Sequence, residues 1–181
     1  MKKMIVLLFF GLFFQVFYAN SQCYLSYNIN QLDSNEVRNG FWIEKNGQQI
    51  IFKHYQKGIL HGAYWIISVY DNHLITIGEF ENGEYSGIWY NFDDNGKLLY
   101  IQSDFKRTSL QIPSIHDAKG FCTHQCYCIF FYPNGCKKSE GLLLWNISPD
   151  SDFTYEYGEW KFFNEAGILK YIKNYTDCLS Q

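Results

Sequence analysis

Proline and clustered positive charge are both scarce in this 181-residue sequence. It contains 3 prolines, and its 15 lysines and arginines are outnumbered by 18 aspartates and glutamates, for a formal net charge of −3. The basic residues form no group of the kind that neutralises nucleic-acid phosphates or binds anionic lipid head groups. We therefore expect neither nucleic acid nor an anionic membrane surface as a partner.

Long apolar runs are also absent after residue 21, where none reaches the roughly 20 residues that a membrane-spanning helix needs. Residues 1–21 differ, because two lysines precede the apolar run from Met4 to Phe14 and small residues end the segment at Ala19-Asn20-Ser21. This pattern is typical of an export signal that is cleaved before the next residue. It predicts a mature chain of residues 22–181, one domain in the periplasm or outside the cell, with no transmembrane segment.

Two alternatives to a cleaved signal concern the membrane. The first is an uncleaved anchor, but Gln15 interrupts an apolar run that is already short. The second is a lipid on Cys23, yet Gln22 stands where a lipoprotein signal has a small residue. We expect the cleaved form.

Aromatic residues are abundant, with 16 Phe, 15 Tyr and 5 Trp, and they favour half-buried strands. A glycine followed two residues later by an aromatic residue recurs ahead of a turn, which indicates an internal repeat. The copies are Gly40-Phe41-Trp42 with a turn at Asn46-Gly47, Gly62-Ala63-Tyr64 with a turn at Asp71–His73, Gly87-Ile88-Trp89 with a turn at Asp93–Gly96, Gly158-Glu159-Trp160 with a turn at Glu165–Gly167, and a degenerate copy at Ile129–Gly135.

Each copy has the pattern strand, tight turn, strand. The joints between copies, Gly58–Gly62 and Gly83–Gly87, place glycine where a turn needs a positive φ. A single hairpin is only marginally stable in water, whereas stacked hairpins bury their aromatic faces against each other. The sequence predicts an all-β chain, an elongated antiparallel sheet of successive hairpin repeats.

The aromatic residue two positions after each repeat glycine should fall on one face of this sheet. We call this set the aromatic stripe: Trp42, Tyr64, Trp89 and Trp160. We interpret it as core, because burying such rings removes roughly 150–250 Å² each from water. The alternative is that the stripe is a binding face.

The repeat, Gly-x-Trp with Asn-Gly and then Tyr/Phe-x-x-Gly-x-x-x-Gly, resembles MORN repeats of the divergent bacterial, antitoxin-like variety. The resemblance implies a scaffold without catalytic residues that binds a protein partner. It divides the chain into a lead-in at 22–37, repeats at 38–105, a cysteine-rich insertion at 106–128 and degenerate repeats at 129–181.

The third copy, Gly87-Ile-Trp-Tyr-Asn-Phe-Asp-Asp-Asn-Gly-Lys-Leu98, is also similar to choline- and glucan-binding cell-wall repeats. That resemblance implies aromatic cages for a quaternary ammonium group or for sugar rings. A cell-wall glycan or choline binder is therefore the alternative function.

The insertion at 106–128 contains the remaining candidates for a binding site, because inserted loops on repeat scaffolds often bind partners. The candidates are His116, His124 and Tyr127. The same region and the next turn concentrate cysteines. An exported chain favours two disulfides among them, and metal ligation or free thiols are the alternatives: Cys122, Cys126, Cys128 and Cys136.

No catalytic pattern accompanies these residues. The five histidines show no His-Glu-x-x-His pair or other metal-ligand spacing, and no nucleophile motif surrounds a cysteine. We expect neither an enzyme nor a cofactor or metal. The predicted function is an exported scaffold for protein–protein interaction at the cell envelope.

Overall fold

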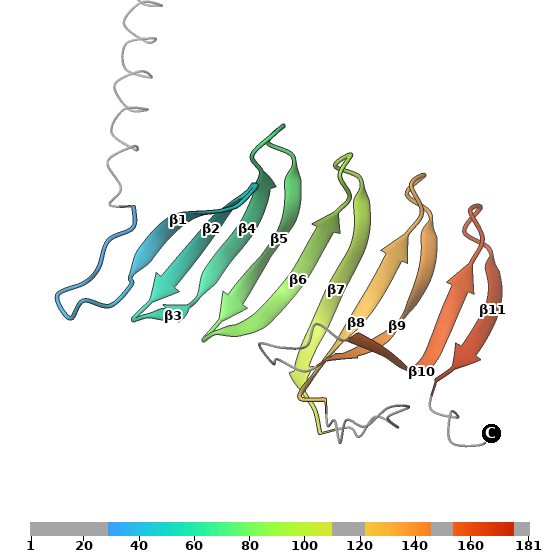
Figure 1. Cartoon of the computed structure of the whole chain (residues 1–181). Helices are drawn as coiled ribbons and strands as arrows, with labels where there is room; N and C mark the ends of the chain where they lie inside the picture. The colour runs from blue at the N-terminus through green and yellow to red at the C-terminus, as the bar shows by residue number, and fades with distance from the viewer. Residues whose placement is uncertain (1–28, 110–121, 146–153, 176–181) are drawn as a thin grey trace, which may run out of the picture.

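The computed structural model describes residues 29–109, 122–145 and 154–175, and these form one 11-stranded antiparallel sheet (Figure 1). The spatial order of the strands follows the chain, and only the short β3, which pairs with β2, lies off this path. The strands are β1 (Gly40–Asn46), β2 (Gln49–Gln56), β3 (Ile59–Leu60), β4 (Gly62–Ser68), β5 (Leu74–Glu81), β6 (Glu84–Phe92), β7 (Leu98–Arg107), β8 (His124–Phe131), β9 (Lys137–Trp145), β10 (Thr154–Phe163) and β11 (Leu169–Asn174).

The sheet is a single open layer, with β1 and β11 at its two ends, as Figure 1 shows. The predicted all-β fold of successive hairpins is therefore confirmed. One boundary differs from the sequence-based division, because β8 begins at His124. Residues 124–128, which we assigned to the insertion, are part of the sheet.

Each predicted joint begins at a hairpin turn. At Asn82-Gly83 both residues have positive φ, 52° and 84°, and Glu81 pairs with Glu84 across the turn. Two consecutive positive φ angles define the two-residue turn whose twist matches that of the flanking strands. Asparagine tolerates this backbone and glycine adopts it freely, which explains their place in the repeat.

The Gly-x-Trp motif marks a bulge in the ladder. On β5, Ile77 and Glu79 pair with Tyr90 and Ser86, so residues 87–89 of β6 all lie opposite Gly78. Gly87 takes a φ of 63° there, and the Trp89 ring folds back onto Gly78. The bulge therefore lets a strand lay its own tryptophan over the preceding strand.

The same arrangement recurs at the other end of the sheet. Residues 158–160 of β10 lie opposite Gly141 of β9, and the Trp160 ring covers that glycine. The indole N–H of Trp160 donates to the carbonyl of Leu142 (3.0 Å). Gly141 has an ordinary strand φ, so it is required by the closeness of the ring rather than by the backbone.

The aromatic stripe is core at two of its four positions. Trp89 and Trp160 are 4% and 0% exposed, which confirms the prediction for both. Tyr64 is half-buried, and so is Trp42 on the first strand, whose indole N–H has no hydrogen-bond partner among the described residues. Trp42 packs instead under the Arg38 guanidinium, 4.7 Å from the ring centre.

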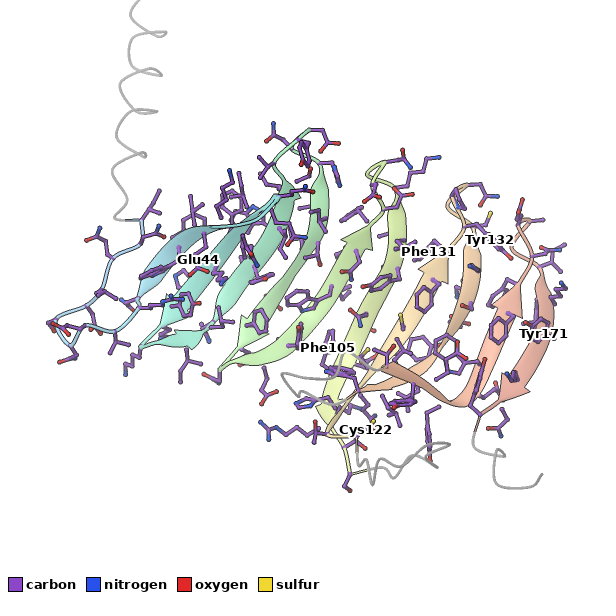
Figure 2. All side chains as sticks on the ribbon, viewed as in Figure 1. Glu44, Phe105, Cys122, Phe131, Tyr132 and Tyr171 are labelled. Atoms are coloured by element: carbon purple, nitrogen blue, oxygen red, sulfur yellow. The ribbon has the colours of Figure 1, made fainter. Side chains whose placement is uncertain are left out.

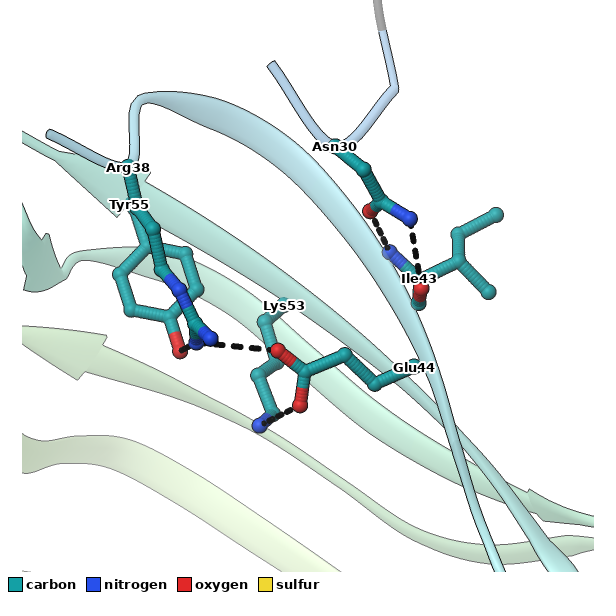
Figure 3. A network of polar contacts seen from close by, with 6 residues as sticks. All are labelled: Asn30, Arg38, Ile43, Glu44, Lys53 and Tyr55. Atoms are coloured by element: carbon teal, nitrogen blue, oxygen red, sulfur yellow. Dashed lines mark hydrogen bonds and ion pairs between the residues drawn. The ribbon is translucent and has the colours of Figure 1, made fainter. Parts of the chain in front are cut away.

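The β1 edge is covered by the segment before it (Figure 3). The side chain of Asn30 accepts from the backbone N–H of Ile43 (2.7 Å) and donates to its carbonyl (2.9 Å), as a neighbouring strand would. Beside it, Glu44 accepts from both Arg38 and Lys53. The amide therefore satisfies backbone groups that an edge strand otherwise exposes.

Candidate functional site

The three candidates from the insertion do not form one site. His116 lies outside the described residues. His124 and Tyr127 both belong to β8, but they are three residues apart on one strand and therefore point to opposite faces. Burial and the neighbouring Glu140 raise the pKa of the Tyr127 phenol to about 12. This hydroxyl therefore stays protonated at neutral pH.

The predicted disulfides are not formed among the described residues: Cys122, Cys126, Cys128 and Cys136 are all free thiols. The sheet register explains this outcome. Cys126 and Cys128 lie two residues apart on one strand, about 6.8 Å between Cα atoms, and across the ladder they face Leu143 and Gly141 rather than cysteine. Both are fully buried and pack under Trp160 as core side chains.

Burial predicts a simple pattern of thiol reactivity. Because it raises the pKa of Cys126 and Cys128 to about 12, both thiols lack the reactive thiolate form at pH 8. We expect iodoacetamide to modify the half-buried Cys136 in the native protein and to leave Cys126 and Cys128 unmodified until urea is added. Peptide mass spectrometry without reduction measures this, and a disulfide found at either strand cysteine would contradict it.

The face opposite the aromatic stripe carries a continuous apolar row. Directly paired positions on seven successive ladder strands are all apolar or aromatic, and each side chain is half-buried or exposed. The row then meets the charged pair Glu140 and Lys161. We call the apolar part the open row: Ile43, Phe52, Trp65, Ile77, Tyr90, Ile101 and Ile129.

A cavity of about 210 Å³ lies on the stripe face, where β6 and β8 begin and β7 and β9 end. We call it the end cavity. Figure 2 labels Phe105 near the lower edge of the sheet, toward the end of β7. Residues from all four strands line the cavity: Glu84 and Tyr85 of β6, Phe105, Lys106 and Arg107 of β7, His124 of β8 and Trp145 of β9.

A bulge in β7 brings two of these side chains to the stripe face. Ser103 pairs with Tyr127 and Lys106 with Gln125, so β7 has one residue more than β8 over this interval. The extra residue is Asp104, whose φ is 55°. As a result Phe105 and Arg107 point to the same face as Gln102. In a strand without the bulge they would point to the opposite face.

The polar groups of the end cavity are linked to each other. Glu84 forms an ion pair with Arg107, and its second oxygen lies 3.3 Å from Nε2 of His124. The guanidinium of Arg107, with a smaller contribution from His124, lowers the pKa of the Glu84 carboxyl. Nδ1 of His124 lies 2.6 Å from the Thr123 hydroxyl. The carboxylate is ionised and its charge is balanced within the cavity.

Aromatic rings form the wall of the same cavity. Tyr85 and Phe105 are stacked with 5.4 Å between their centres, and Trp145 stands edge-on to both. His124 stacks on Trp145 at 5.6 Å. These contacts hold the wall in place on four hydrogen-bonded strands.

Other kinds of site are not found in the described part of the chain. It contains no group of three or more histidine, cysteine or acidic side chains arranged to hold a metal ion. Within residues 29–109, 122–145 and 154–175 no helix has the length and apolar character needed to cross a membrane. In comparisons with known proteins, no family model and no curated protein matches this sequence.

Sequence reasoning found one lining residue of the end cavity, His124, and missed the other six. Their signal is weak: Glu84, Phe105, His124 and Trp145 recur at intervals of about 20 residues, close to the length of one hairpin repeat. That spacing shows which strands they occupy. It does not show the bulge that turns Phe105 to the cavity side.

Proposed function

We propose that the protein is an exported scaffold of MORN-like repeats that binds a protein partner at the cell envelope, without catalysis. The observation that carries the proposal is the open row. A single-layer sheet can bury one face in its own stripe of large rings, but nothing among the described residues covers the other face. Contiguous exposed apolar surface on a folded chain is typical of a protein interaction site.

The state of the aromatic stripe supports this function over a repeat-borne glycan or choline site. Such a site needs neighbouring stripe rings open to water, and here Trp89 and Trp160 are buried against Gly78 and Gly141. The stripe therefore contributes stability. The surface left for a partner is the opposite face.

The open row also has a defined end. Ile43 to Ile129 are followed on the same line by Glu140, which bonds Lys137, and by Lys161. Charged residues are typical of the rim of an interface, while its centre is depleted of them. We infer that the partner covers β1 to β8 and stops at β9.

Charge placed in the open row tests this proposal. The full chain, expressed with its own N-terminal segment, is used as bait in an envelope extract of the native host, beside an Ile77→Lys/Ile101→Lys variant. Ile77 is 38% exposed and Ile101 is half-buried on the same open face, so the change should leave the fold intact while it places two unpaired charges in the interface. We expect at least about a tenfold loss of the captured protein.

Ile172→Lys is the matched control. It lies on the same line of the sheet beyond the charged pair and is 51% exposed. It should capture as much partner as the unmodified chain, and circular dichroism checks that all three fold. Equal capture by the double variant, or retention of polysaccharide alone, would refute the proposal.

A further inference from the structure

We propose that the end cavity binds a single sugar ring, so that the protein has a carbohydrate site separate from its partner surface. The cavity is bounded by ordered strands and lies on the face opposite the open row. Its volume, about 210 Å³, is below the roughly 300–1,000 Å³ of sites for drug-sized ligands. It therefore has room for one six-membered ring with its substituents.

The charges of the cavity favour a neutral ligand over a cation. Glu84 and Arg107 neutralise each other, and Lys106, which also lines the cavity, adds a positive charge that disfavours a cation. A quaternary ammonium group would also meet the guanidinium of Arg107, whose side chain is 77% exposed and lines the cavity. An anion would face the carboxylate of Glu84.

The same ion pair suits hydroxyl groups. A carboxylate only accepts hydrogen bonds and a guanidinium only donates them, whereas each hydroxyl can do both. Neighbouring hydroxyls on a sugar can therefore bond Glu84 and Arg107 together without breaking their pairing. The His124 ring, 3.3 Å from the same carboxylate, adds a further polar group beside them.

The aromatic wall suits the other side of a sugar. A pyranose ring has an apolar face of C–H groups, and such a face packs on the face of an aromatic ring. Tyr85 and Phe105 each have one face stacked on the other, and the rest of these rings lines the cavity next to the ion pair together with Trp145. Because the rings are held by each other and by paired strands, the site is formed before the ligand arrives.

Saturation-transfer NMR tests the proposal directly. The purified full chain is mixed in turn with glucose, galactose, mannose, N-acetylglucosamine and choline, each at millimolar concentration. We expect transfer to at least one sugar and none to choline. Glu84→Gln, which keeps the shape of the side chain and removes its charge, should weaken that sugar at least about tenfold, because the hydroxyl loses its charged acceptor.

A second variant and a control keep the test decisive if one variant folds poorly. Arg107→Ala changes an exposed side chain and should cause a comparable loss. Tyr171→Ala removes an aromatic ring that is 48% exposed on β11, far along the sheet, and should bind the sugar normally. Transfer to choline alone, no transfer to any sugar, or unchanged sugar binding by both cavity variants would overturn the proposal.

Discussion

Replacing Gly141 with alanine is expected to lower the free energy of unfolding by about 1–3 kcal/mol, the usual cost of overpacking. A methyl group at this position would lie 2.5 Å from the indole carbons of Trp160. The ring cannot retreat, because it is fully buried and its N–H is bonded to Leu142. Denaturant unfolding followed by circular dichroism measures the change.

A double-mutant cycle shows whether the ring is the cause. Trp160→Ala alone should cost about 3–5 kcal/mol, since it opens a large cavity in the core. In that background Gly141→Ala should no longer destabilise. It should even stabilise, by roughly 0.5–1 kcal/mol, because alanine is better than glycine inside a strand. An equal cost in both backgrounds would show that the ring contact is irrelevant.

Gly78 and Trp89 allow the cycle to be repeated at an independent position, where the added methyl group would lie 2.2 Å from the ring. Gly135→Ala is the matched control. Gly135 has a φ of 84° with no atom within 4 Å of an added methyl group, so its cost comes from the backbone alone. That cost should persist when Trp160 is replaced.

Raising the pH above 9 is expected to destabilise the protein through Cys126 and Cys128. Burial raises the pKa of both thiols from 9.0 to about 12 in the folded state. The folded state therefore favours the protonated form, so its stability is complete below pH 9 and is lost as the pH rises toward 12. At pH 10.5 the loss should be about 2 kcal/mol for one thiol.

The control for this prediction is the Cys126→Ala/Cys128→Ala variant. Its unfolding free energy will be lower at pH 7, because two core side chains are truncated. Between pH 8 and pH 10.5, however, it should fall less steeply than that of the unmodified chain. Parallel curves would mean that the thiols do not titrate upon unfolding.

The strands and turns, which are local features of the fold, could be predicted from the sequence. Gly-x-Trp and Asn-Gly show where strands and turns lie, because positive φ angles and ring positions depend on neighbours along the chain. The glycines beneath the rings could also have been found. Gly78 and Gly141 interrupt apolar strands without forming a turn, which is a sign of close approach by another group.

The features that sequence missed depend on register. The end cavity exists because Asp104 is an additional residue in β7, and a shift of one residue moves every later side chain to the other face. A count of residues does not reveal that shift. The disulfide prediction failed for a similar reason, since nearness in sequence put Cys126 and Cys128 side by side on one strand rather than opposite each other.

The chain-ordered pairing of the strands has a consequence for how the molecule folds. In the described sheet every principal strand lies next to the strands that precede and follow it, so the sequence separation of contacting residues stays small for an all-β protein. Low contact order favours rapid folding, and any hairpin can act as a nucleus from which its neighbours add in turn. Folding should therefore proceed by the sequential addition of neighbouring hairpins along the sheet. Removal of β11 should leave the preceding hairpins folded.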